Sequence, residues 1–125
     1  MRFRSKYGNR KVVLDGHKFD SRKEAKCYLY LKERQEAGEI SDLRLQVPFE
    51  IIPEIRERRV VHLKTKDKEV EKCVQKAVHY VADFVYKDNA TGKEEVVDAK
   101  GFRTEGYKLK KKMMRAFNGI EILEV

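Results

Sequence analysis

Val78-His-Tyr-Val-Ala-Asp-Phe-Val-Tyr86 is the stretch of sequence that decides the fold. It is rich in β-branched and aromatic residues at both odd and even positions, which predicts a strand buried on both faces at the centre of a sheet. Asn89-Ala-Thr-Gly92 supplies a turn, and a second strand is expected from Glu94 to Lys100, ended by Gly101. We therefore expect these two strands to form an antiparallel hairpin at the centre of the sheet.

The segment before this hairpin predicts a short hairpin and a helix. An Asp-Gly pair between apolar residues in 11–19 is a strong hairpin signal. A helix should follow, capped by Asp20 or Ser21 and ended at Gly38, with Glu24 at the spacing of a capping box. Its buried stripe is expected to comprise Ala25, Tyr28, Leu29 and Leu31.

The middle of the chain is read as a connector over 40–45, a strand over 47–53 and an extra hairpin-like arm over 55–76. The two prolines of that strand favour its ends or a sheet edge. For the arm, a short helix is the alternative to the hairpin.

The C-terminal part predicts a basic amphipathic helix over 104–117 and a final strand over 120–125. The apolar face of this helix is expected to comprise Tyr107, Leu109, Met113, Met114 and Phe117. No linker or repeat divides the chain, so we expect one α/β domain over 1–125: a mixed central sheet flanked by two helices, with a core in the order αβββαβ.

The charge distribution points to a polyanionic partner. The 125 residues carry a net charge of +8. Residues 1–26 hold nine basic and three acidic side chains, and residues 100–115 hold seven and one. Two basic ends suggest a phosphate-binding surface if they meet in the fold, although scattered solvated lysines are the simpler reading. No apolar run is long enough for a membrane span, and no secretory signal is visible, so a cytoplasmic location is expected. Cys27 and Cys73 suggest neither a disulfide framework nor a zinc site.

The central hairpin predicts a cluster of charged side chains. If 89–92 form a four-residue loop, Asp83 lies directly opposite Asp98, and Lys100 projects from the same face of its strand. Val81, Val85 and Val96 flank this half-buried position. Two opposed carboxylates on an apolar face are costly unless a cation compensates, and carboxylate oxygens suit Mg²⁺ or Mn²⁺.

Two alternatives stay open at this point. A cross-strand pair between Lys100 and one aspartate could balance the charge without a metal. Glu24 could be only a capping-box or helix-surface acid, and Gln46 could be either a neighbour of the site or an ordinary loop-edge amide.

Taken together, three elements resemble the PD-(D/E)XK nuclease superfamily: Glu24 in Phe19-Asp-Ser-Arg-Lys-Glu-Ala25, Asp83 in Tyr80-Val-Ala-Asp-Phe84, and Asp98-Ala-Lys-Gly101. The chain looks most like the small phage branch, which contains Holliday junction resolvases and related endonucleases. The resemblance covers residues 10–125 and implies a restriction-endonuclease-like core. Ala82 stands where the superfamily motif has proline, and 55–76 is an addition.

The resemblance implies a role for each matching residue. Asp83, Asp98 and the backbone carbonyl of Ala99 would hold Mg²⁺, for which Mn²⁺ would substitute, and Glu24 would complete the metal site. Lys100 would position the attacking water. The expected reaction is hydrolysis of a DNA phosphodiester to leave a 5′-phosphate, in phage or prophage recombination and, for a phage-encoded chain, in the host cytoplasm.

The expected partners are branched or duplex DNA and a second copy of the chain. A homodimer follows if the substrate is a four-way junction, because symmetric cutting needs two active sites; 47–76 is the expected interface. The alternatives are a nicking or duplex endonuclease without junction preference, and a non-catalytic basic protein that binds nucleic acid. The residues expected to contact DNA are Arg4, Lys6, Arg10 and Lys11 near the N-terminus, and Arg103, Lys108, Lys111, Lys112 and Arg115 near the second helix.

Overall fold

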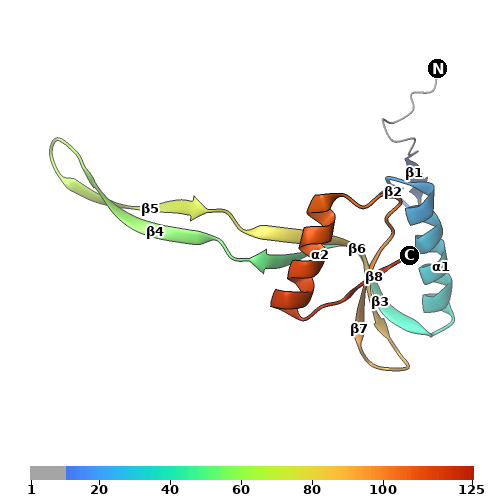
Figure 1. Ribbon diagram of the computed structural model, residues 1–125. Helices are drawn as coiled ribbons and strands as arrows, with labels where there is room; N and C mark the ends of the chain where they lie inside the picture. The colour runs from blue at the N-terminus through green and yellow to red at the C-terminus, as the bar shows by residue number, and fades with distance from the viewer. Residues whose placement is uncertain (1–10) are drawn as a thin grey trace, which may run out of the picture.

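A computed structural model describes residues 11–125 (Figure 1). The predicted basic arm at 1–10, with Arg4, Lys6 and Arg10, lies outside the described residues. In chain order the elements are β1 (Val12–Leu14), β2 (His17–Phe19), α1 (Arg22–Glu36), β3 (Ile40–Ile52), β4 (Ile55–His62), β5 (Asp67–Gln75), β6 (Val78–Asp88), β7 (Glu94–Asp98), α2 (Glu105–Asn118) and β8 (Ile122–Glu124). A mixed four-stranded sheet, ordered β3-β6-β7-β8, forms the centre, and two-stranded sheets are formed by β1-β2 and by β4-β5. The predicted class, mixed α/β with two helices, is confirmed.

The β6–β7 hairpin has the register that its loop predicts. Phe84 lies opposite Val97, and the pairing continues to Lys87 opposite Glu94. The Asp88 N–H donates to the Lys93 carbonyl at 2.9 Å, which closes the four-residue loop. One step beyond the Phe84–Val97 pair, the same register brings Asp83 and Asp98 to the same end of the ladder.

Two hydrophobic clusters pack on the sheet. Phe84, Tyr86 and Val97 are buried with residues of α1 and with Phe19 of the N-terminal hairpin. Val85, Val96 and Ile122 are buried with Tyr107 and Met114 of α2. Because neighbouring residues of β6 and β7 face different helices, the sheet lies between α1 and α2, as Figure 1 shows.

Strand β3 is longer than the sequence suggests. The expected connector over 40–45 is wrong, because β3 starts at Ile40 and pairs with β6 along its length. A shift in register lies between Ser41 and Arg44, where Asp42 has φ +56°. Such a bulge breaks the regular alternation that identifies a strand. Pro48 is tolerated because β3 is an edge strand.

Ser21 caps α1 as expected, and both helices have narrower buried faces than the sequence suggests. The side chains of Ser21 and Thr104 cap α1 and α2, and Gly119 ends α2 at φ +65°. Leu29, Leu109 and Phe117 were expected to be buried, and this is wrong, since they are 46%, 57% and 64% exposed. The buried hydrophobic residues are Ala25, Tyr28 and Leu31 in α1 and Tyr107 and Met114 in α2.

Residues 55–75 form an antiparallel hairpin of β4 and β5, inserted between β3 and β6. Figure 1 shows this arm extending well away from the sheet and both helices. Without the arm and the N-terminal hairpin, the order is α1-β3-β6-β7-α2-β8, which is the expected αβββαβ sequence of elements. No helix within residues 11–125 is long and apolar enough to cross a membrane.

Candidate active site

Three carboxylates from three separate elements are buried in the body of the protein. Glu24 lies in the first turn of α1, Asp83 in the middle of β6 and Asp98 at the end of β7. Their exposed fractions are 7%, 7% and 0%. The reading of Glu24 as a surface acid is therefore wrong. The site is also buried more deeply than expected, although the flanking Val81 is exposed.

The backbone holds two of these acids in place. The Ser21 hydroxyl accepts a hydrogen bond from the Glu24 N–H at 3.1 Å, which fixes the start of α1 and hence the position of Glu24. The Ala99 N–H, directly after β7, donates to Asp83 Oδ2 at 3.0 Å. This bond ties the carboxylate of β6 to the backbone that carries Asp98.

Gln46, in β3, links α1 to β6 through hydrogen bonds to Glu24 and Asp83. Its Nε2 donates to Glu24 Oε1 at 3.2 Å and to Asp83 Oδ1 at 3.3 Å. Gln46 lies between the Leu45–Phe84 and Val47–Ala82 pairs of the β3–β6 ladder and has φ +51°. A left-handed conformation is costly for a residue with a side chain, and such strain is characteristic of functional sites. The structure thus places Gln46 beside the carboxylates.

Asp98 is held by a hydrogen bond from Tyr80. The Tyr80 hydroxyl donates to Asp98 Oδ2, whereas Oδ1 is buried and has no hydrogen-bond donor within the described residues. The Lys100 ammonium lies 3.5 Å from Oδ1, an ion-pair distance without a hydrogen bond. One oxygen of Asp98 thus remains available to a cation.

Lys100 lies just outside the sheet. The expectation that the second strand extends to Lys100 is wrong, because β7 ends at Asp98. The Lys100 ammonium lies 5.4 Å from the centroid of the Tyr107 ring, and its backbone carbonyl accepts from Lys23 Nζ at 3.1 Å. Its side chain is about one-third exposed, so the ammonium reaches from the buried aspartate towards the surface.

Burial and mutual repulsion make it costly for the carboxyl groups of this cluster to ionise. Burial first, and then hydrogen bonding and charge repulsion from Asp98, raise the pKa of Asp83 to about 7. Burial also raises the pKa of Glu24, with a smaller contribution from the charge of Asp20. Lys100 is the only cation in ion-pair contact with any of the three carboxylates in the described part of the chain. One ammonium cannot balance three carboxylates.

The donor set fits a hard divalent cation. Within residues 11–125 no group of three His, Cys, Asp or Glu side chains is already spaced as a metal-ligand set. Instead, the Gln46 amide bridges two of the acids, and Asp98 keeps one oxygen without a hydrogen bond. Crowded carboxylate oxygens with excess negative charge are the chemistry that Mg²⁺ and Mn²⁺ stabilise.

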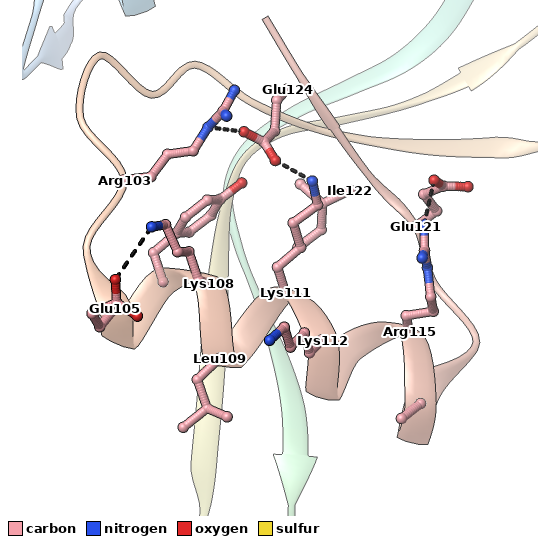
Figure 2. A pocket seen from close by; sticks show the side chains of 12 residues that line it. Arg103, Glu105, Lys108, Leu109, Lys111, Lys112, Arg115, Glu121, Ile122 and Glu124 are labelled. Atoms are coloured by element: carbon pink, nitrogen blue, oxygen red, sulfur yellow. Dashed lines mark hydrogen bonds and ion pairs between the residues drawn. The ribbon is translucent and has the colours of Figure 1, made fainter.

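A groove of about 780 Å³ lies along α2 and β8 (Figure 2). It is lined by Arg103, Lys108, Lys111, Lys112 and Arg115, five of the residues expected to contact DNA. Glu124 belongs to the same groove and lies beside Asp98 in the β7–β8 register. The groove therefore includes the residue that pairs with Asp98 across the sheet.

Most of the groove cations already have acidic partners. Arg103 and Lys111 both pair with Glu124. Lys108 pairs with Glu105 at 3.2 Å, and Arg115 pairs with Glu121 at 2.6 Å. Among the groove cations, Lys112 alone has no ion pair to the described residues. Lys11, the one N-terminal candidate that the structure describes, is exposed.

Sequence reasoning did not single out Tyr80 or Glu124. Tyr80 is 3% exposed, and a buried tyrosine hydroxyl normally has a hydrogen-bond partner, so its position in a buried strand was a usable signal. Glu124 carried no such signal, because its role depends on the parallel pairing of β8 with β7.

The fold and site define a mixed α/β protein with a buried carboxylate cluster and a groove whose lining includes five cations. The model of the family described as "Protein of unknown function (DUF1064)" matches residues 4–121, so the chain belongs to that family. Searches among curated proteins and among solved structures gave no match.

Proposed function

We propose that this protein is a metal-dependent DNA endonuclease of the PD-(D/E)XK type, with a restriction-endonuclease-like core. The observation that carries the proposal is the convergence of Glu24, Asp83, Asp98 and Lys100, from α1, β6 and the end of β7. The αβββαβ order supports it, because the same elements carry the motif residues in that superfamily. The raised pKa of Asp83 supports it as well, since such crowding is typical of functional sites.

Each residue of the site has a separate role in the proposed hydrolysis. Asp83 and Asp98, with the Ala99 carbonyl and Glu24, would hold Mg²⁺ or Mn²⁺. The bound ion would polarise the phosphate and lower the pKa of a water molecule. Lys100, partly exposed and next to Asp98, orients the attacking water and stabilises charge on the phosphate. Water adds to phosphorus and the P–O3′ bond breaks, so that a 5′-phosphate and a 3′-hydroxyl result.

Two further residues position the three carboxylates. Tyr80 fixes the orientation of Asp98 through its hydroxyl, and the Gln46 amide keeps Glu24 and Asp83 close together. A cation at the carboxylates would replace that amide as the group that offsets their charge.

The substrate that we favour is branched DNA, above all a four-way junction. The α2 groove provides Lys112, and its paired cations can exchange their carboxylate partners for phosphates, so binding should weaken as salt rises. One chain carries one such cluster among its described residues, and paired cuts across a junction need two. The proposal therefore includes a homodimer.

The direct test is cleavage of a labelled four-way junction beside a linear duplex of the same sequence, with Mg²⁺. The Asp98→Asn variant, prepared identically, excludes a contaminating nuclease. Paired, opposed nicks in the junction alone are the expected result. Equal cutting of both substrates would remove the junction preference, and no cutting by the wild-type protein would overturn the nuclease.

One observation favours the second candidate, a non-catalytic nucleic-acid-binding protein. The Lys100–Asp98 pair is the self-balancing contact that such a protein would contain. It leaves Glu24 and Asp83 without an ion-paired cation in the described residues. This candidate predicts that Asp98→Asn leaves function intact and that no divalent ion binds.

A further inference from the structure

The two faces of the β4–β5 arm differ in charge. Residues directly opposite each other in an antiparallel pair share a face. The basic face comprises Glu57, Arg59, Val61, Lys68, Val70 and Lys72. The acidic face comprises Arg56, Arg58, Val60, His62, Asp67, Glu69, Glu71 and Cys73. The β5 sequence Asp67-Lys-Glu-Val-Glu-Lys-Cys73 shows this segregation directly, because its acids and its lysines alternate.

Each face of the arm contains one Arg–Glu ion pair. On the acidic face, Arg56 lies 3.5 Å from Glu71, and His62 shares a hydrogen bond of 2.8 Å with Asp67. On the basic face, Arg59 contacts Glu57 at 3.4 Å. Lys68 and Lys72 make no ion pair within residues 11–125, so the basic face presents uncompensated positive charge.

The body of the protein does not cover the arm. Every residue of β4 is exposed, and Val61 is 41% exposed on the basic face. An isolated two-stranded ribbon is only marginally stable in water, so a surface of this length is better explained by a partner than by folding alone. Eight residues of β4 span roughly 26 Å at ~3.3 Å per residue, which carries the basic face well away from the carboxylates.

We propose that the basic face of the arm binds the phosphates of a DNA duplex, as a contact separate from the active site. This inference rests on the proposed function. The major groove of B-DNA is wide enough to admit a two-stranded β-ribbon, and lysines on its face reach the phosphates. A second copy of the chain is a poorer occupant, because a symmetric contact through this face would bring the same cations together. The arm would let one subunit hold DNA at two places, as a branched substrate requires.

The test measures DNA binding without cleavage. All proteins carry Asp98→Asn, and their affinity for a labelled four-way junction is measured by fluorescence anisotropy from 50 to 200 mM salt. The variant Lys68→Gln/Lys72→Gln removes two cations from the basic face. Arg56→Gln/Arg58→Gln removes the same charge from the acidic face and is the matched control. Lys68→Arg/Lys72→Arg retains the charge and should bind like the parent.

The expected loss for the basic-face variant is on the order of tenfold at 50 mM salt, with a salt slope smaller by about 1.8, as two phosphate contacts predict. The control should lose much less. Equal affinities for the two glutamine variants would overturn the arm contact. A basic-face variant that binds normally but sediments as a smaller species would overturn it in favour of self-association.

Failure of the proposed function would look different. Active-site failure shows as absence of cleavage by the protein with Asp98 intact, whatever the arm carries. Failure of the arm contact shows as unchanged DNA binding by Lys68→Gln/Lys72→Gln in the Asp98→Asn background, while the protein with Asp98 intact cleaves.

Discussion

The crowding of the carboxylates predicts that removing one of them stabilises the metal-free protein. Asp83→Asn replaces a buried acid with a neutral amide of nearly the same shape. The amide oxygen can still accept from the Ala99 N–H, and the repulsion from Asp98 disappears. We therefore expect the variant to be more stable than the wild type above neutral pH in EDTA.

The magnitude follows from the pKa of Asp83. The folded-state pKa, about 7, lies above the ordinary 3.8, so the folded protein binds this proton more tightly than the unfolded chain. The contribution of the Asp83 carboxyl group to the free energy of unfolding is largest below pH 3.8 and is lost as the pH rises towards 7. At ~1.36 kcal/mol per pKa unit, the loss by pH 8 is about 4 kcal/mol. Weakened hydrogen bonds to the new amide cost about 1 kcal/mol, so a net gain of about 3 kcal/mol is expected.

Urea unfolding in EDTA at pH 5 and pH 8 measures the difference. The gain from Asp83→Asn should be clear at pH 8 and much smaller at pH 5. Asp42→Asn is the control, since the Asp42 side chain is 70% exposed and pairs with Arg44 rather than with a second acid. An equal gain at both pH values, or no gain at pH 8, would refute the argument that repulsion and burial raise this pKa.

Three further predictions concern single residues. In a cleavage assay with Mg²⁺, Asp98→Asn should lower the rate at least 100-fold while junction binding in EDTA persists, and a rate close to wild type would contradict the metal-ligand role. Tyr80→Phe should cost about 1–3 kcal/mol in chemical unfolding, because buried Asp98 loses its hydroxyl donor; an unchanged midpoint would show that the bond contributes nothing. Gly119→Ala should cost about 1 kcal/mol in thermal unfolding, since Gly119 has φ +65° at the end of α2, and an equally stable variant would argue against that cap.

Local chemistry explains which parts of the fold could be predicted from the sequence. The Asn89–Gly92 turn sets the β6–β7 register, because loop length fixes which residues face each other. Ser21 and Gly119 mark helix ends through side-chain capping and left-handed backbone, both of which are local effects.

Longer-range features were harder to predict. The bulge at Asp42 and the left-handed Gln46 interrupt β3, so the pattern of residues 40–45 does not show a strand. Leu109 and Phe117 lie on the apolar side of α2 by spacing, but the sheet does not reach them. Whether a residue touches a neighbouring element depends on how the elements pack.

The candidate site also combines a feature that follows from local sequence with features that depend on how the elements pack. The approach of Asp83 to Asp98 follows from strand register, and Glu24 joins them only through the packing of α1. The pairing of Arg103 and Lys111 with Glu124 could not be read from the sequence, because it depends on β8 lying parallel to β7.

The central claim is that Glu24, Asp83 and Asp98 form a divalent-metal site, and calorimetric titration of Mn²⁺ tests it most directly. The titration is run on the wild-type protein and on Asp98→Asn, each alone and with a four-way junction whose phosphodiesters at the branch are non-hydrolysable analogues. The account predicts saturable binding to the wild-type protein, strengthened by DNA, and a loss of that binding in Asp98→Asn. No saturable binding to the wild-type protein with DNA present, or equal binding to both proteins, would contradict it.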